Sequence, residues 1–179
     1  MAEVVLKVPK KKRKSQKPTI VLDMDETMIH SAHEHSADVF KQISIPVTPE
    51  TKDLRVDFSS DSIQIYVMAR PGLFEFLFRI GQLYEIIAWT LAPQAYAEVA
   101  LDLIQDTMKR DYGVKKVFKN RLYRQDCDEG VKDLRKLQID LGKVLIVDDV
   151  AESFQLQKEN GLQIPKYIGG TDVQLLHLC

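Results

Sequence analysis

Acidic side chains follow two apolar runs of strand length in this sequence. Asp23 and Asp25 come after the run Thr-Ile-Val-Leu, and Asp148 and Asp149 come after the run Val-Leu-Ile-Val. Burying several carboxylates together is costly unless a cation compensates their charge, so the pattern predicts a metal site. Magnesium is the expected ion, because it takes oxygen ligands and leaves coordination positions for water and phosphate oxygens. Calcium stays open as an alternative.

Asp23 and Asp25 are two residues apart, which allows a division of labour between them. In an extended backbone such side chains point the same way, so both can face one phosphate while Met24 packs behind them. A carboxylate beside a metal ion is a competent nucleophile toward phosphorus and forms an aspartyl-phosphate. The second carboxyl, with its pKa raised by neighbouring acids, can protonate the leaving oxygen and then activate water.

A third polar residue, Thr90, follows the apolar run Ile-Ile-Ala-Trp. In open parallel α/β sheets the ligand crevice lies just beyond the carboxyl ends of the strands, so the three polar sites are expected to converge. Each site alone has a plainer explanation, because Asp and Thr often cap the helix that follows a strand. Three such sites in one chain, two of them with doubled carboxylates, favour a shared site.

Short apolar runs alternate along the chain with longer segments of helical period, which is the pattern of a parallel sheet covered by helices. The expected strands are 19–22, 84–89, 117–123, 144–147 and 163–168, and the expected helices are 73–80, 93–108, 132–137 and 151–158. Residues 63–68 are expected to belong to an inserted hairpin, and Asp172 to cap a closing helix. The predicted fold class is therefore α/β, with a Rossmann-like parallel sheet flanked by helices.

The 179 residues, 45% hydrophobic and 28% charged, suit one globular domain. No apolar run approaches the ~20 residues of a membrane-spanning helix, so no membrane partner is expected. Cys127 and Cys179 show no zinc or disulfide spacing, which fits a reducing compartment. From Pro18 onward the chain has 18 basic and 25 acidic residues. This acidic balance argues against direct nucleic-acid binding, whose affinity comes mainly from basic side chains.

Residues 1–17 are polar and basic without hydrophobic period, which predicts a disordered tail ahead of one domain over 18–179. The stretch from Pro9 to Lys14 resembles a monopartite nuclear localisation signal, so we expect a nuclear protein. A solvated tail or an expression tag is the alternative, and the protein is then as readily cytoplasmic.

The segment Asp23-Met24-Asp25-Glu26-Thr27 resembles the Asp-x-Asp-x-Thr/Val signature of haloacid dehalogenase-type phosphotransferases. The chain is most similar to the branch of small C-terminal-domain phosphatases, which includes the phosphatase-like proteins named for interaction with a nuclear LIM factor. The matching motifs lie at 21–31, 70–72, 89–90, 123–127, 131–134 and 144–149. The resemblance implies a haloacid dehalogenase-like fold and a magnesium-dependent phosphatase acting on phosphoserine or phosphothreonine in proteins, such as the tail of RNA polymerase II.

The resemblance also implies roles for the acidic residues. Asp23 would be both nucleophile and metal ligand, and Asp25 would be the acid/base and bind the metal through its carbonyl. Asp149 stands where the family usually has a metal-binding Asn, and Asp148 is its acidic neighbour and a further candidate metal ligand. The change from Asn to Asp should still permit magnesium, with one more negative charge.

On the substrate side, the resemblance implies that Thr90 and Lys132 hold the phosphoryl oxygens and that Arg124 contacts the phosphorylated substrate. Without this resemblance, Lys132 could equally lie on a solvated helix face, and Arg124 could equally form a surface ion pair. The segment between Asp23 and Thr90 has room for a hairpin but not for a large cap domain. An open site favours a phosphorylated loop or tail of another protein over a small metabolite.

Three other interpretations stay open. Residues 143–149 look like the acidic strand end of a signalling receiver domain, although receiver domains carry their paired acids in the first strand. A binding protein with a phosphatase-like fold and no turnover is the second alternative. The third is a zinc site at His30, His33 and His35, for which no cysteine or acid partner has suitable spacing.

Overall fold

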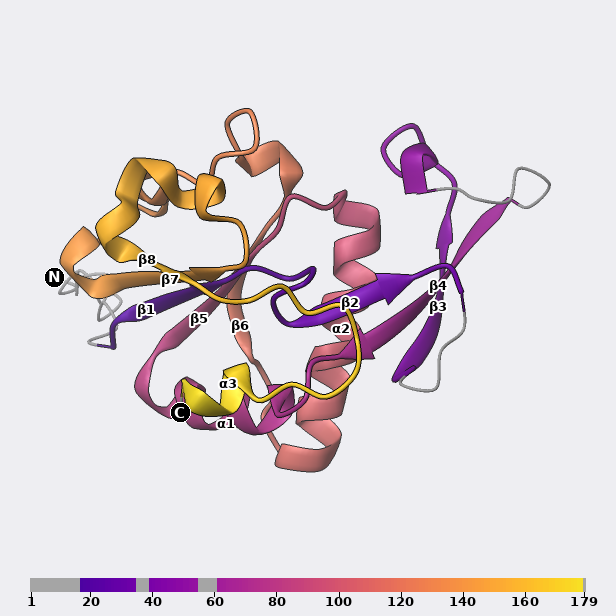
Figure 1. Ribbon diagram of the computed structural model, residues 1–179, viewed down its shortest axis with the longest axis horizontal. Coiled ribbons are helices and arrows are strands. Elements are labelled where there is room, and N and C mark those ends of the chain that lie inside the picture. Colours follow the sequence, from indigo (N-terminus) through magenta and orange to yellow (C-terminus); the bar gives the residue numbers. More distant parts are fainter. Residues whose placement is uncertain (1–16, 35–38, 55–60, 179) are drawn as a thin grey trace, which may run out of the picture.

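The main sheet of the computed structural model, which describes residues 17–34, 39–54 and 61–178, contains five parallel strands in the order β6-β5-β1-β7-β8 (Figure 1). These strands are β1 (Thr19–Leu22), β5 (Glu85–Trp89), β6 (Phe118–Leu122), β7 (Val144–Asp148) and β8 (Gly161–Gln163). Counted along the chain, the order is 3-2-1-4-5, which is the Rossmann order rather than the 2-1-3-4-5 of flavodoxin-like domains. The α/β prediction is confirmed, and the receiver-domain interpretation is wrong.

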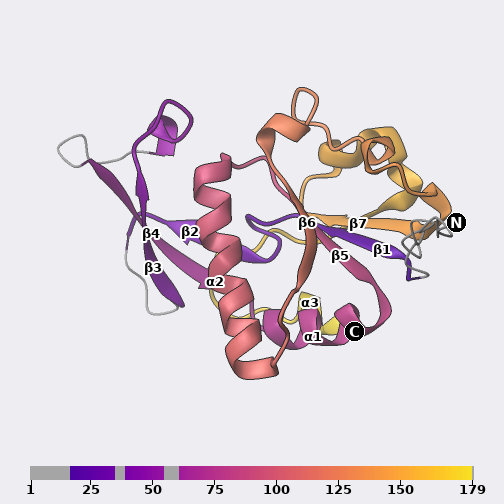
Figure 2. The same cartoon turned by 180° about the vertical axis from the view of Figure 1, so that it is seen from behind.

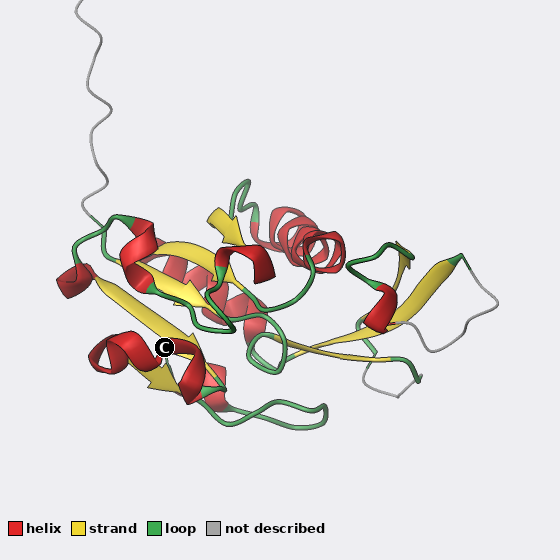
Figure 3. Ribbon diagram, turned by 90° about the horizontal axis from the view of Figure 1, so that it is seen from above, coloured by secondary structure: helices red, strands yellow, loops and turns green. Residues whose placement is uncertain are grey.

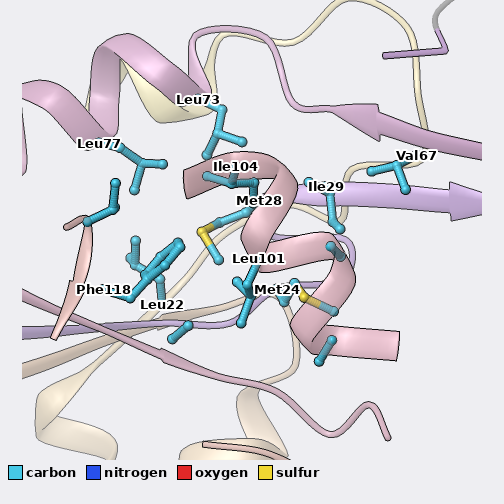
Figure 4. Close-up of a cluster of buried hydrophobic side chains, with 14 of the residues drawn as sticks. Leu22, Met24, Met28, Ile29, Val67, Leu73, Leu77, Leu101, Ile104 and Phe118 are labelled. Carbon is cyan, nitrogen blue, oxygen red and sulfur yellow. The ribbon is translucent and has the colours of Figure 1, made fainter. Parts of the chain in front are cut away.

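The central strand β1 is buried along its whole length, because both faces of the sheet are covered. Ile20 and Leu22 point into a core with the two long helices, whereas Val21 points into a second core on the other face. Figure 4 shows Leu22 with side chains from both helices and from β6. The alternation explains why a run of consecutive apolar residues forms this strand.

Two α-helices, α1 (Leu73–Leu83) and α2 (Gln94–Tyr112), cover one face of the sheet (Figure 2). The other face carries 3-10 helices, most of them visible as short coils in Figure 3. These short helices are η2 (Arg124–Asp126), η3 (Leu134–Leu137), η4 (Leu141–Lys143) and η5 (Ala151–Asn160), and a last α-helix, α3 (Gln174–His177), lies near α1. Helix α2 runs past its predicted end to Gly113, whose φ of 69° is the left-handed conformation that glycine readily adopts after a helix.

A small antiparallel sheet extends from the main body and contains β2 (Ile29–Ala32), β4 (Ser62–Ala69) and β3 (Lys41–Pro46) (Figures 1 and 2). The 3-10 helix η1 (Lys52–Leu54) precedes β4 in the chain. Strand β3 alternates, burying Ile43 and Ile45 while its other residues face solvent. The predicted hairpin is therefore present with a third strand added, and no large cap domain is found among the described residues.

Three local predictions need correction. The strand predicted over 163–168 is wrong, because β8 ends at Gln163. Pro165 has no N–H to donate to a sheet, and its carbonyl instead accepts a hydrogen bond from Arg70. The predicted helices 132–137 and 151–158 form as the 3-10 helices η3 and η5, and η5 contains non-helical backbone at Phe154 and Gln157.

The N-cap of the closing helix lies one residue later than predicted, at Val173 and not at Asp172. Asp172 accepts a hydrogen bond from the Gln174 N–H at 2.9 Å, but Val173 occupies the N-cap position and the main partner of Asp172 is Arg70. Over the described ranges, no helix is both long and apolar enough to cross a membrane. Residues 1–16, which contain nearly all of the predicted tail and its whole basic stretch, lie outside the described residues.

Candidate active site

The polar strand ends predicted from the sequence converge on one cleft with a volume of about 370 Å³. The predicted residues that line it are Asp23, Asp25, Thr90, Arg124, Asp148 and Asp149. The cleft lies where β1 and β7 are neighbours and the strand order reverses, which is the usual ligand crevice of such sheets. Convergence therefore follows from the topology, because parallel strands bring their carboxyl ends to one edge.

Lys132 links the first aspartate to β7. Its Nζ lies 2.5 Å from Oδ1 of Asp23 and 2.7 Å from Oδ2 of Asp148, and the lysine is fully buried. Burial raises the pKa of Asp23 to about 7, against the attraction of Lys132. Burial also works against the ammonium, but the two carboxylates more than compensate and raise the pKa of Lys132. Lys132 is thus an ion-paired group of the site, and the solvated-face interpretation is wrong.

Asp149 completes a group of three carboxylates. One oxygen each from Asp23, Asp148 and Asp149 lies within 4.8 Å of the others. Thr27, the threonine of the signature, donates from Oγ1 to Asp149 at 3.2 Å and accepts from the Asp149 N–H at 3.1 Å. Burial and the charge of Asp148 raise the pKa of Asp149. Three acids against one lysine leave a negative cluster with hard oxygen donors, which fits Mg²⁺.

The backbone turns sharply after Asp23. The N–H groups of Met28 and Ile29 donate to the Met24 carbonyl at 2.8 and 3.0 Å, and Glu26 has a φ of 62°. Met24 and Met28 are fully buried and point into the core (Figure 4). As predicted, Met24 packs away from the site, so the turn presents the carboxylates at positions 23 and 25 to the cleft.

Asp25 accepts its side-chain hydrogen bonds from two hydroxyl groups. The Tyr96 hydroxyl donates to its Oδ1 at 2.6 Å, and Thr90 donates to its Oδ2 at 3.4 Å. Burial raises the pKa of Asp25 to about 6, the hydrogen bond from Tyr96 lowers it, and the charge of Glu26 raises it. The Ser31 hydroxyl lies 2.6 Å from the Tyr96 hydroxyl. Sequence reasoning missed Tyr96 and Ser31.

A signal for Tyr96 was present in the sequence. It lies one turn before Ala100 on the apolar face of α2, and a buried tyrosine usually directs its hydroxyl to a polar partner. Ser31 carries no comparable signal, because a serine within an edge strand has no fixed role. Its contribution depends on contact with a residue 65 positions away.

The two other residues predicted to contact phosphate lie on one side of the cleft. Thr90 is buried after β5, and its Oγ1 accepts from the Ala92 N–H at 3.0 Å. Arg124 opens η2, and its Nε donates to the Leu91 carbonyl at 2.7 Å. Arg124 lines the cleft, and none of the described acids forms an ion pair with it, so the alternative of a surface ion pair is not found in the described ranges.

Arg70 is a third residue for which no role was predicted from the sequence, although it belongs to the matching motif at 70–72. Its buried guanidinium binds both carboxylate oxygens of Asp172 at 2.9 Å and the carbonyls of Thr27 and Pro165 at 3.2 and 2.8 Å. The Tyr167 ring lies 5.6 Å from the guanidinium carbon. Arg70 therefore fastens the turn after Asp25 to the C-terminal segment.

The histidines do not gather into a metal site in the part of the chain that the structure describes. His30 Nδ1 lies 2.8 Å from Oε1 of Glu26, and His33 lines the cleft. His35 lies outside the described residues. The group of possible metal ligands found in the described ranges is the aspartate trio, which favours magnesium over the zinc alternative.

Comparison with known proteins agrees with this geometry. Residues 18–179 match the family model of NLI interacting factor-like phosphatases, so the chain belongs to this family. It is 34% identical over 167 residues to the CTD small phosphatase-like protein of Homo sapiens, covering 90% of this chain and 54% of that relative. It is 35% identical over 180 residues to nuclear envelope morphology protein 1 of Schizosaccharomyces pombe, covering 96% of this chain and 34% of that relative.

The chain spans about half the length of several curated relatives that it matches. Among solved structures, the fission yeast RNA polymerase II CTD phosphatase Fcp1 bound to beryllium fluoride superposes with a TM-score of 0.66 at 23% identity. The match covers 89% of this chain and 45% of that chain. At this identity the likeness establishes a shared fold, which confirms the predicted haloacid dehalogenase-like architecture.

Proposed function

We propose that this chain is a magnesium-dependent phosphatase of phosphoserine or phosphothreonine in proteins, acting through an aspartyl-phosphate on Asp23. One observation carries the proposal. Asp23 directly follows the central strand β1, is paired with a buried lysine, and shares a cleft with a second carboxyl held by hydroxyl donors. Family membership supports the same activity, and the extent of the matched domain supports a boundary near residue 18.

The residues present fit a magnesium ion. Asp23, Asp148, Asp149 and the carbonyl of Asp25 would hold it, as oxygen donors that Mg²⁺ accepts. When bound, the ion would neutralise negative charge on the site and on the substrate phosphate.

In the first step, Asp23 attacks phosphorus. Its Oδ1 is engaged by Lys132, whereas Oδ2 accepts no hydrogen bond from the described residues and is the attacking atom. A new P–O bond forms to Oδ2 as the bond to the substrate oxygen breaks. Asp25, in its protonated form, gives its proton to that leaving oxygen. We expect Lys132, through its pair with Asp23, and Thr90 to balance charge on the phosphoryl oxygens.

In the second step, water attacks the phosphorus of the aspartyl-phosphate. Asp25, now ionised, takes a proton from this water as the bond to Asp23 breaks. Inorganic phosphate leaves, and both carboxyl groups return to their starting states. A raised pKa suits Asp25 to both directions of proton transfer near neutral pH.

The shape of the cleft supports a protein substrate. Its apolar wall comes from the small sheet, from η1 and from the loop after β5, through residues that include Ala32, Leu54, Ile65, Leu91 and Pro93. No large cap covers it within the described ranges, so a phosphorylated segment of another protein can enter. Relatives named as CTD phosphatases favour such a substrate. We expect Arg124, which lines the cleft, to contact this segment.

The purified chain should hydrolyse serine or threonine phosphopeptides with Mg²⁺ and lose activity with EDTA. Asp23→Asn should abolish turnover, because an amide is a poor nucleophile. Asp102→Asn is the matched control, since Asp102 pairs with Arg121 on the outer side of α2. Turnover that survives Asp23→Asn would contradict the nucleophile, and an inactive unmodified chain would point to a binding protein.

We also propose a nuclear or nuclear-envelope location. The basic stretch from Pro9 to Lys14 and relatives named for the nuclear envelope support it. Deleting residues 1–17 should move a fluorescent fusion toward the cytoplasm. If the nuclear fluorescence were unchanged, the basic stretch would not be what directs the protein to the nucleus.

A further inference from the structure

A chain of three hydroxyl-bearing and acidic side chains crosses from the small sheet to the cleft. Ser31 lies on β2, Tyr96 lies in the first turn of α2, and Asp25 lies in the turn after β1. The Tyr96 hydroxyl is 2.6 Å from both the Ser31 Oγ and the Asp25 Oδ1. Such short distances define a continuous hydrogen-bond chain.

The direction of the protons in this chain follows from the chemistry of its members. A carboxylate only accepts, and a phenol has one proton to give, so the Tyr96 proton points at Asp25. The Tyr96 oxygen then accepts from Ser31. Burial and the charge of Asp25 raise the pKa of Tyr96 well above its ordinary value, so the phenol keeps its proton.

The tyrosine hydroxyl is held in a fixed place. Tyr96 is 4% exposed, and its backbone N–H bonds to the Pro93 carbonyl at 3.2 Å at the start of α2. On the other side of the carboxyl, Thr90 reaches Oδ2 and is itself bonded by the Ala92 N–H. Both carboxyl oxygens of Asp25 therefore accept hydrogen bonds, one from α2 and one from the residue after β5.

We propose that Tyr96 is a positioning residue that fixes the Asp25 carboxyl toward the leaving oxygen, and that Ser31 orients the Tyr96 proton. This inference rests on the proposed phosphatase function. Tyr96 would act through Asp25 and not on the substrate phosphate. Because Tyr96 holds Oδ1 at 2.6 Å, whereas Thr90 lies 3.4 Å from Oδ2, proton exchange with substrate and water passes through Oδ2.

A positioning role has a kinetic signature that mere packing lacks. Proton donation matters when the leaving group is a serine or threonine alkoxide and matters little for p-nitrophenolate, which leaves without a proton. Tyr96→Phe keeps the ring and removes only the hydroxyl. It should lower kcat/KM for a phosphoserine peptide about 10-fold or more, and for p-nitrophenyl phosphate less than about threefold.

Two matched variants sharpen the test. Ser31→Ala should give the same pattern with a smaller loss, because the tyrosine keeps its proton but loses its orienting partner. Tyr112→Phe, a tyrosine at the far end of α2 that packs against Phe78, should leave both substrates unchanged.

The outcomes separate the inference from the proposed function. Equal losses of Tyr96→Phe on both substrates, or no loss on either, would overturn the positioning role while leaving the phosphatase intact. An unmodified chain that turns over neither substrate with Mg²⁺ would overturn the proposed function and this inference together.

Discussion

Asp23 and Asp25 are separated by one residue, but their carboxylates lie in different surroundings. Asp23 faces charge, with the Lys132 ammonium on one oxygen and two further aspartates nearby. Asp25 faces neutral hydroxyls, from Tyr96 on one oxygen and from Thr90 on the other. Burial raises the pKa of both carboxyl groups.

The difference suits the two roles proposed for one short turn. Lys132 opposes the effect of burial on the pKa of Asp23, and a bound cation would further favour the ionised form that a nucleophile needs. The hydroxyl donors orient the Asp25 carboxyl, and burial raises its pKa to about 6, which suits an acid that must later act as a base. The four predictions below test this contrast.

The largest expected effect comes from removing the acid while keeping the nucleophile. Asp25→Asn should lower kcat/KM for a phosphoserine peptide by about 10³-fold, a typical contribution of general acid–base catalysis. With p-nitrophenyl phosphate the same variant should still form phosphorylated enzyme, seen as a burst of p-nitrophenol followed by slow turnover. A variant without a burst would contradict the separation of roles.

Removing the ammonium group of Lys132, which pairs with Asp23, should lower stability as well as activity. Lys132→Met leaves Asp23 and Asp148 facing each other in a buried place, and the free energy of unfolding should fall by about 3 kcal/mol without metal. Mg²⁺ should restore part of this loss. Denaturant unfolding with and without Mg²⁺ measures both.

A lysine outside the site gives the comparison for this variant. Lys136→Met removes an exposed pair with Asp128 and should change stability by less than about 0.5 kcal/mol. If the two lysine variants lowered the free energy of unfolding equally, Lys132 would not be the cation that compensates buried Asp23 and Asp148.

The pH dependence of the metal effect follows from the raised pKa values. Asp23 titrates at about 7 in the folded chain, above its ordinary value near 4, so the folded state holds the proton more tightly than the unfolded state. Without metal, this group lowers stability progressively as pH rises from about 4 to about 7. Mg²⁺ needs the ionised carboxylates, so it should raise Tm more near pH 8 than near pH 5.

A thermal melt series at several pH values, with Mg²⁺ or EDTA, measures this. A larger Mg²⁺ shift at the acidic end would mean that the metal does not bind through ionised Asp23.

The smallest effect is expected at the residue that orients Asp149. Thr27→Val keeps the shape but removes both hydrogen bonds to Asp149 and should raise the Mg²⁺ concentration for half-maximal activity about 10-fold. Activity at saturating Mg²⁺ should change little. Thr107→Val, at a buried threonine of α2, is the control. Lost activity that Mg²⁺ cannot restore would place Thr27 on the catalytic side instead.

Much of the Asp23 side could be predicted from the sequence. The carboxylates directly follow strands, and the topology of a parallel sheet brings strand ends together, so Asp23 and Asp149 needed only local patterns. Lys132 does not follow a strand, and it was predicted as a site residue only because it lies in the matching motif at 131–134.

The Asp25 side was mostly hidden. Tyr96 and Ser31 act through contacts between separate elements. The place of Tyr96 on the apolar face of α2 indicated a buried hydroxyl but not its partner, and Ser31 carried no signal. Arg70 lay in a matching motif, but its partner Asp172 is 102 positions away, so its role could not be predicted. The strand predicted over 163–168 failed because a local apolar pattern does not show that the chain turns at Pro165 toward Arg70.

The most direct test of the central claim is to find the phosphoryl group on the enzyme. Asp25→Asn, incubated briefly with p-nitrophenyl phosphate and Mg²⁺ and then quenched, should carry an aspartyl-phosphate that borohydride reduces to homoserine. Peptide mapping by mass spectrometry should place this homoserine at position 23. A mark at another residue, or no mark while the burst is present, would contradict Asp23 as the nucleophile.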